Sequence, residues 1–247
     1  MRLIVNADDF GLTRGVNLGI IEALQRGVVR SATLMAQMPA TDHAIALSKG
    51  FPELAVGVHL CLTYGEPMSD NVPTLLDGSG SFQTQRAFWE NQSMNPAEIE
   101  KELQAQIDHV LAQGLGISHL DGHHHCHRHA LVAPAAEKLA ARYAIPLRPV
   151  NGKVRYKGKS LAFSEDFYGK GASEAAFLAT VKHFYHKVDV LEIMVHPGLV
   201  DEPLLQTSRY AMERAHELAV LSAATLPEKL AELGVTPDNY TCFSVLD

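Results

Sequence analysis

A dense histidine cluster is the first feature of this chain that could do chemistry. Six of the thirteen histidines fall between positions 119 and 129. Neutral imidazole is the commonest protein ligand for divalent transition metals, so the cluster predicts a metal site. Because a zinc-like site takes only three or four protein ligands, part of the cluster must serve another purpose. The segment has the sequence His119-Leu-Asp121-Gly-His123-His124-His125-Cys126-His127-Arg-His129.

Ionisable residues also follow several apolar, strand-like runs elsewhere in the chain. In parallel α/β folds the carboxyl ends of the strands share one face, which is where active sites form. One carboxylate plus two imidazoles with an open position is a normal catalytic metal site. The sequence therefore predicts a site assembled from distant segments. The pairings are 3–7 before Asp8 and Asp9, 54–58 before His59, 117–120 before Asp121, and 190–195 before His196.

The adjacent acids Asp8 and Asp9 are expected to divide the work. Successive side chains of a strand point to opposite faces, so the two carboxylates should not point the same way. One can ligate the metal while the other acts as general base. The alternative is that both acids merely favour the amino end of the following helix through its dipole.

The single histidines at strand ends have two interpretations. His59 is either a ligand or a hydrogen-bonded structural residue. His196 precedes Pro197 and Gly198, which predict a turn that exposes its side chain, so it is a candidate general acid.

Within the cluster, alternation along a strand places His119, Asp121 and His123 on one face. These three residues also match an H-x-D-x-H metal pattern found in several hydrolase classes. The other histidines of the cluster are expected to hydrogen-bond ligands, to contact substrate, or to be solvated near a helix start. A metal-storage tract is a further alternative, although it would not need acids at other strand ends. The residues concerned are His124, His125, His127 and His129.

The roles of a single cysteine and of one charged pair stay open. Cys126 is either a soft metal ligand or an inert buried thiol. Arg214 and Glu217 lie three residues apart on a predicted helix. They could form a surface ion pair, or they could orient an active-site residue from behind.

Strand-like runs alternate with helical patterns along the whole chain, which predicts βα units and a largely parallel sheet. No internal repeat or linker interrupts them, so residues 1–247 are expected to form one domain. The expected strands are 3–7, 31–36, 54–58, 117–120, 145–150, 190–195 and 242–246. The expected helices are 16–25, 40–49, 95–113, 131–143, 173–186, 209–221 and 227–233.

Composition limits the classes of partner. The net charge is −7, and no long basic run provides the footprint that nucleic-acid binding needs. No apolar run approaches the roughly 20 residues of a membrane span. The three cysteines match neither a zinc knuckle nor a redox pair, which favours the cytoplasm. The sequence leaves the oligomeric state open, a homodimer included.

Four blocks together resemble the YdjC/ChbG-like carbohydrate deacetylases. They occur in the expected order and span nearly the whole chain. One departure is Gly122, where the family commonly has serine. The blocks are Asn6-Ala7-Asp8-Asp9-Phe10-Gly11, Gly57-Val58-His59-Leu60-x-Leu62-Thr63, His119-Leu120-Asp121-Gly122-His123-His124-His125-x-His127 and Val195-His196-Pro197-Gly198.

The resemblance implies a TIM-barrel-like (β/α) fold, irregular or with fewer than eight strands. It also implies a deacetylase of N-acetylated sugars, chitooligosaccharides in particular. One divalent ion, most simply Mg or Zn, would be held by Asp9, His59 and His123. Asp8 would be the general base and His196 the acid.

The remaining candidate residues would support ligands or touch the sugar. Among them are His119, Asp121 and Arg214 beside the other cluster histidines. The long segments 64–93 and 151–171 are expected to be functional loops. Their aromatic residues Trp89, Phe167 and Tyr168 could stack on sugar faces.

Two rival functions differ in testable ways. Another hydrolase of the H-x-D-x-H type, a phosphoesterase or an amidohydrolase, would use His119 and Asp121 as ligands. A non-catalytic metal- or sugar-binding protein would bind both without releasing acetate.

Overall fold

The computed structural model describes residues 1–150 and 152–243. Its centre is one curled sheet with the strand order β4-β3-β2-β1-β7-β6-β5, and β8 pairs with β1. All pairings are parallel except the hairpin between β5 and β6. The strands are β1 Arg2–Phe10, β2 Ser31–Leu34, β3 Ala55–Leu60, β4 Leu120–Gly122, β5 Lys153–Tyr156, β6 Lys159–Ser164, β7 Val190–Val195 and β8 Pro237–Asp238.

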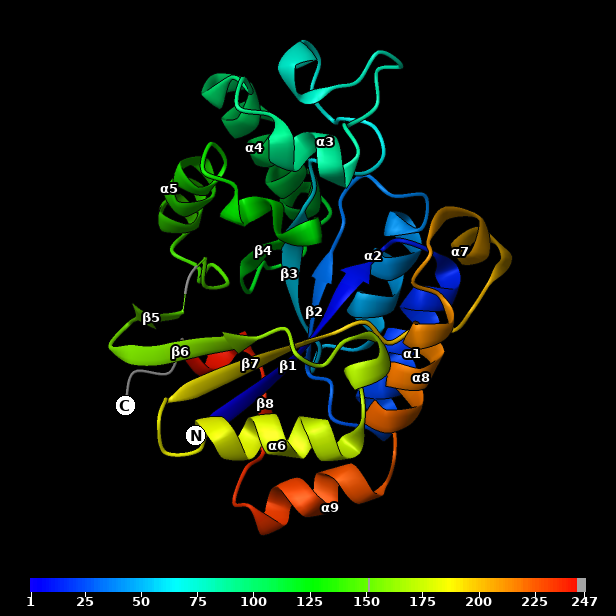
Figure 1. The fold of residues 1–247 in the computed structure, drawn as a ribbon, viewed down its shortest axis with the longest axis vertical. Coiled ribbons are helices and arrows are strands. Elements are labelled where there is room, and N and C mark those ends of the chain that lie inside the picture. Colours follow the sequence, from blue (N-terminus) through cyan, green and yellow to red (C-terminus); the bar gives the residue numbers. More distant parts are fainter. Residues whose placement is uncertain (151, 244–247) are drawn as a thin grey trace.

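The helices surround this sheet, and α1 packs beside α8 (Figure 1). The result is a TIM-barrel-like fold with an incomplete barrel, as the resemblance implied. The α-helices are α1 Arg14–Arg26, α2 Thr41–Gly50, α3 Gln85–Glu90, α4 Pro96–Ala112, α5 Ala133–Tyr143, α6 Glu174–Phe184, α7 Glu202–Thr207, α8 Met212–Leu221 and α9 Thr225–Glu232. The 3₁₀ helices are η1 Pro73–Leu75, η2 His123–Arg128, η3 Gly169–Gly171 and η4 Tyr240–Phe243.

Local sequence explains where several helices begin. Asn95 caps α4 by accepting from the amide of Ala97, and Pro96 occupies the first helical position, as predicted. The Thr13 hydroxyl caps α1 in the same way. No described helix is long and apolar enough to cross a membrane.

Strands β1, β2, β3, β4 and β7 are buried on both faces, which is typical of parallel sheets covered by helices, whereas β5 and β6 at the edge are partly exposed. In β1 every residue after Arg2 is buried. The side chains that face the inside of the curl are largely polar. Asn6, Thr33, His59, Asp121 and Glu192 are each almost completely buried. The fold therefore keeps a polar interior, and the site forms there.

Three expected elements differ in the structure. Segment 145–150 makes only an isolated bridge between Leu147 and Leu120, because Pro146 and Pro149 lack the amide donors of a ladder. Segment 242–246 was expected to be a strand, but its described part belongs to η4, and residues 244–246 lie outside the described residues. The expected loop 151–171 contains the β5–β6 hairpin.

Candidate active site

A bulge at the end of β1 brings Asp8 and Asp9 into the same cavity. The pairing of β1 with β2 shifts register between Ala7 and Phe10, and Asp9 has a φ of +68°. Aspartate tolerates this left-handed conformation better than most residues. Both carboxylates line one cavity. The expectation that they point to opposite faces was therefore wrong, since it assumed a regular strand.

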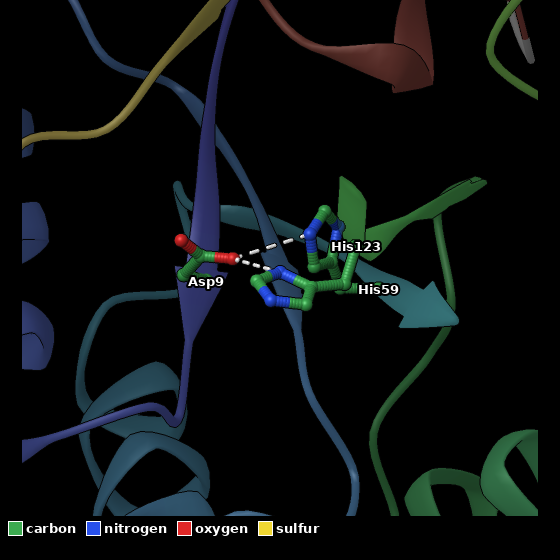
Figure 2. Close-up of side chains that lie close together, drawn as sticks. All are labelled: Asp9, His59 and His123. Atoms are coloured by element: carbon green, nitrogen blue, oxygen red, sulfur yellow. Dashed lines mark hydrogen bonds and ion pairs between the residues drawn. The ribbon is translucent and has the colours of Figure 1, made fainter. Parts of the chain in front are cut away.

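Asp9, His59 and His123 meet at one point, although they come from β1, β3 and η2 (Figure 2). One oxygen of Asp9, Oδ1, lies 3.3 Å from His59 Nε2 and 2.9 Å from His123 Nδ1. An ion about 2.0–2.1 Å from tetrahedral donors would hold those donors roughly 3.3 Å apart. The spacing and the chemistry of this donor set therefore fit a divalent ion.

The orientation of the His59 ring is fixed from behind. Its Nδ1 lies 2.7 Å from Asp121 Oδ1, so the ring donates there and leaves Nε2 for the Asp9 side. Burial alone would lower the pKa of His59, but the carboxylates of Asp121 and Asp8 raise it to about 10. The carboxylates therefore favour a positive charge at this point, which a bound divalent ion also supplies.

The second oxygen of Asp9 accepts from Arg214 Nη2 at 2.5 Å. Burial would raise the pKa of Asp9, but Arg214 and His123 hold it well below its usual value. Arg214 and Glu217 are both buried on α8, so the surface ion pair considered from the sequence was wrong. Arg214 instead orients Asp9 from behind, as the alternative predicted.

Asp8 is held by a residue that the sequence analysis missed. The guanidinium of Arg148 binds it with two bonds, 2.8 Å to Oδ2 and 2.7 Å to Oδ1. Burial would raise the pKa of Asp8, but Arg148 lowers it far below its usual value. A charged residue between two prolines, after a short apolar run, was the available signal for Arg148.

Glu192 was also missed. It lies inside the apolar strand β7, where a lone carboxylate is unusual. Its Oε1 accepts from Arg148 Nε at 2.9 Å, and Arg148 Nη2 lies 2.9 Å from Asp121. One buried guanidinium therefore holds three carboxylates.

His196 follows β7 and lines the same cavity as Asp8 and Asp9. Its ring lies 5.5 Å from that of Tyr168 and 5.6 Å from that of Tyr210, measured between centroids. Burial lowers the pKa of His196 to about 4, although Asp9 and Asp8 oppose the shift. Its backbone amide donates to Glu217, which anchors this strand end to α8.

The rest of the histidine cluster divides between the cavity and the interior: His124 and His125 line the same cavity, and the ring of His124 lies 3.9 Å from that of His123 between centroids. His124 and His125 both have positive φ, near +50°, which turns the chain sharply after His123. His124 Nδ1 lies 3.0 Å from the Thr63 hydroxyl, and His125 pairs with Glu165. His127 is buried with neither ring nitrogen hydrogen-bonded to a described residue.

His119 is not part of the group formed by Asp9, His59 and His123, and its ring stacks on Tyr240. Two other groups of suitable ligand atoms exist among the described residues, Asp8 with His59 and Asp121, and His119 with Asp121 and Glu192. The guanidinium of Arg148, however, already lies 2.7 Å from Asp8, 2.9 Å from Asp121 and 2.7 Å from Glu192. A positive charge therefore fills both positions, and the geometry favours the set around Asp9.

The family model for YdjC-like proteins matches residues 2–232. The chain belongs to the YdjC-like family. It is 44% identical over 241 residues to a carbohydrate deacetylase from Geobacillus stearothermophilus, covering 97% of both chains. It is 45% identical to another from Brevibacillus brevis, covering 92% of this chain and 94% of that one.

A solved structure from Enterococcus faecalis, of a protein named for cellobiose-phosphate cleavage, is also similar. It superposes with a TM-score of 0.91 at 33% identity and covers 98% of each chain. The YdjC-like fold is thus shared over the full length of the two chains.

The cavity of this YdjC-like protein has a volume of about 570 Å³, room for a small saccharide. Of the three aromatic residues expected near sugar, only Tyr168 lines it. Phe167 is buried against Phe177, and Trp89 packs on His129. Tyr168 is half exposed and stacks on Tyr210 at 4.3 Å.

Proposed function

We propose that this protein is a metal-dependent hydrolase that removes acetyl groups from N-acetylated sugars, with chitooligosaccharide-type substrates. The observation that carries the proposal is the convergence of a fitting donor set, a held carboxylate and an imidazole in one cavity. Asp9, His59 and His123 would hold the ion, while Asp8 and His196 face the same space. Relatives named carbohydrate deacetylase, at 44% and 45% identity, support the same activity.

Amide hydrolysis needs an activated water, a stabilised oxyanion and a proton for the departing amine. When bound, the divalent ion supplies Lewis-acid chemistry that polarises the acetyl carbonyl and lowers the pKa of water. A carboxylate and two imidazoles suit zinc-like ions better than magnesium, which prefers oxygen ligands.

Asp8 is the proposed general base. Arg148 keeps its carboxylate ionised and fixes its direction, so a free lone pair can accept the proton of the attacking water. Because its pKa is lowered, Asp8 is a weak base. It can accept the proton only if a bound ion also lowers the pKa of the water.

His196 is the proposed general acid. With a pKa near 4 the imidazole is neutral at pH 7, so it must first take up a proton. Once it has taken a proton from solvent, the imidazolium is a strong acid and passes that proton to the leaving amine. The exposed ring of Tyr168 beside it is the proposed stacking surface for a sugar.

The test is acetate release from a panel of N-acetylated mono- and disaccharides, using chelated protein and protein reloaded with single divalent ions. We expect release only after reloading, and no release with the Asp9→Ala variant. No release from any sugar with any ion would overturn the proposal and favour a non-catalytic binding protein. Turnover that survives Asp9→Ala but not His119→Ala would favour the H-x-D-x-H rival instead.

A further inference from the structure

A continuous buried chain of polar groups runs from Asp8 to the far end of the barrel. Asp8 is bound by Arg148, Arg148 by Glu192, and Glu192 by the hydroxyl of Tyr240. Each of these four residues is almost completely buried. The chain links the proposed base to the 3₁₀ helix near the carboxyl end.

Glu192 holds the Nε edge of the guanidinium, with Oε1 also 2.7 Å from Nη2, and Asp121 lies 2.9 Å from the same Nη2. Arg148 Nη1 and Nη2 bond to Asp8, while Nε donates to Glu192 Oε1 at 2.9 Å. The ring of Phe163 lies against the guanidinium, 4.7 Å from it. Since the group is planar, holding its Nε edge sets the direction of the two bonds to Asp8.

Tyr240 donates a hydrogen bond to the second carboxylate oxygen of Glu192. Its hydroxyl donates to Oε2 at 2.5 Å. Without that hydroxyl, a buried carboxylate oxygen would lose its donor, which favours protonation of Glu192 and weakens its bond to Arg148. The bond from Tyr240 therefore supports the charge that orients Arg148.

Tyr240 itself is held in place and does not reach the active-site cavity. Its ring stacks on His119 with centroids 3.6 Å apart and planes at 11°. A Cβ on Gly57 would lie 2.6 Å from the His119 ring, so glycine is needed there for this stack. Tyr240 lines a different cavity, at the amino ends of β3 and β4.

We infer that Tyr240 is a positioning residue for Asp8, acting through Glu192 and Arg148. The inference rests on the proposed function, in which Asp8 is the base. It assigns a role in turnover to a segment that contacts neither substrate nor metal ligands.

The first experiment compares Tyr240→Phe with the wild type. We expect kcat to fall by about 10- to 100-fold, the size of effect expected from a small misplacement of a catalytic group. KM and the bound-metal content should stay unchanged, because neither the sugar wall nor the three ligands are altered. The matched control is Tyr156→Phe, whose hydroxyl bonds to the Ala144 carbonyl and whose ring lines the same distant cavity. Its kcat should equal that of the wild type.

A double-mutant cycle with Glu192→Gln distinguishes an effect passed along the hydrogen bonds from Tyr240 to Asp8 from a general loss of stability. If the two residues act in series, the double variant Tyr240→Phe, Glu192→Gln should have the same kcat as whichever single variant has the lower kcat. Multiplying losses, an unchanged kcat in Tyr240→Phe, or a rise in KM alone would each overturn the inference. If Tyr240→Phe does not fold, Glu192→Gln takes its place in the comparison with the wild type, with the same expectations.

A readout independent of activity distinguishes this inference from the proposed function. The Nε–H resonance of Arg148, followed with ¹⁵N-arginine, should shift and exchange faster in Tyr240→Phe. That change is expected even if the wild type releases no acetate. A resonance identical to the wild type would overturn the inference while leaving the proposed function intact.

Discussion

Asp9 has three partners at once, because one carboxylate oxygen faces two imidazoles while the other accepts from Arg214. Removing its side chain should therefore reduce both metal binding and the free energy of unfolding. Asp8, by contrast, contacts Arg148 but none of the three proposed donor atoms of the metal site is its own. At the scale of single residues, the adjacent acids should have separable effects.

We expect Asp9→Ala to abolish stoichiometric metal binding, measured by elemental analysis after dialysis. It should also lower the free energy of unfolding by about 3–5 kcal/mol, because the buried Arg214 loses its partner. The control is Asp70→Ala, an exposed aspartate, which should change neither quantity. Full metal occupancy in Asp9→Ala would refute the ligand assignment.

Asp8→Asn should keep the metal and lose turnover. The amide still offers one oxygen to Arg148 but cannot accept a proton from water. We expect kcat to fall by roughly 10²- to 10⁴-fold, measured by acetate release with the ion-loaded variant. Wild-type turnover in this variant would remove Asp8 as the base.

At the scale of elements, close contact between α1 and the turn after β7 positions His196. A Cβ on Gly19 would lie 2.5 Å from the Cα of Gly198, and one on Gly15 would lie 2.4 Å from the carbonyl oxygen of Leu199. Because the contacted atoms belong to the backbone, an added Cβ would have to push the helix and the turn apart. The small residues of α1 therefore set how near the His196 segment approaches the helix.

Gly19→Ala should displace that turn. We expect a loss of about 1–3 kcal/mol in the free energy of unfolding, together with reduced kcat, because His196 shifts with its turn. Gly50→Ala is the matched control, since nothing lies within 4 Å of its added Cβ. Thermal melts and acetate release check both variants. Equal behaviour of the two would contradict the packing argument.

At the scale of the whole molecule, stability should depend on the buried acid Glu217. Burial raises its pKa to about 7, although the Tyr210 hydroxyl and the His196 amide oppose the shift. The folded state therefore binds the proton more tightly than the unfolded chain. This contribution to stability is complete below the unfolded pKa near 4.5 and is lost as the pH rises through 7.

Glu217→Gln removes this dependence. Between pH 4.5 and 7 the variant should gain about 3 kcal/mol relative to the wild type, since each unit of pKa is worth about 1.4 kcal/mol. Urea unfolding at several pH values measures the difference. A difference that stays flat across the window would mean that Glu217 is not protonated in the folded protein.

The sequence alone determined the features that follow from local patterns. Alternating strand and helix signals predicted the parallel sheet. Ionisable residues after strand-like runs predicted that distant acids and histidines would meet, and the family resemblance selected Asp9, His59 and His123 among them. Such patterns are informative because the carboxyl ends of parallel strands lie along the same edge of the sheet. The single-domain organisation, the cytoplasmic location and a homodimer stay predictions.

Only the tertiary structure decided how those residues are held. The bulge at Asp9 depends on pairing with β2, and no local periodicity encodes it. Arg148 reaches Asp8 across 140 positions of sequence, and Tyr240 reaches Glu192 from another segment. Such contacts are chosen by long-range packing and by the need to pair buried charges. The local pattern thus indicates the acids and histidines that follow the strands, and the folded barrel adds Arg148 and Glu192 and sets the directions and charges of the whole group.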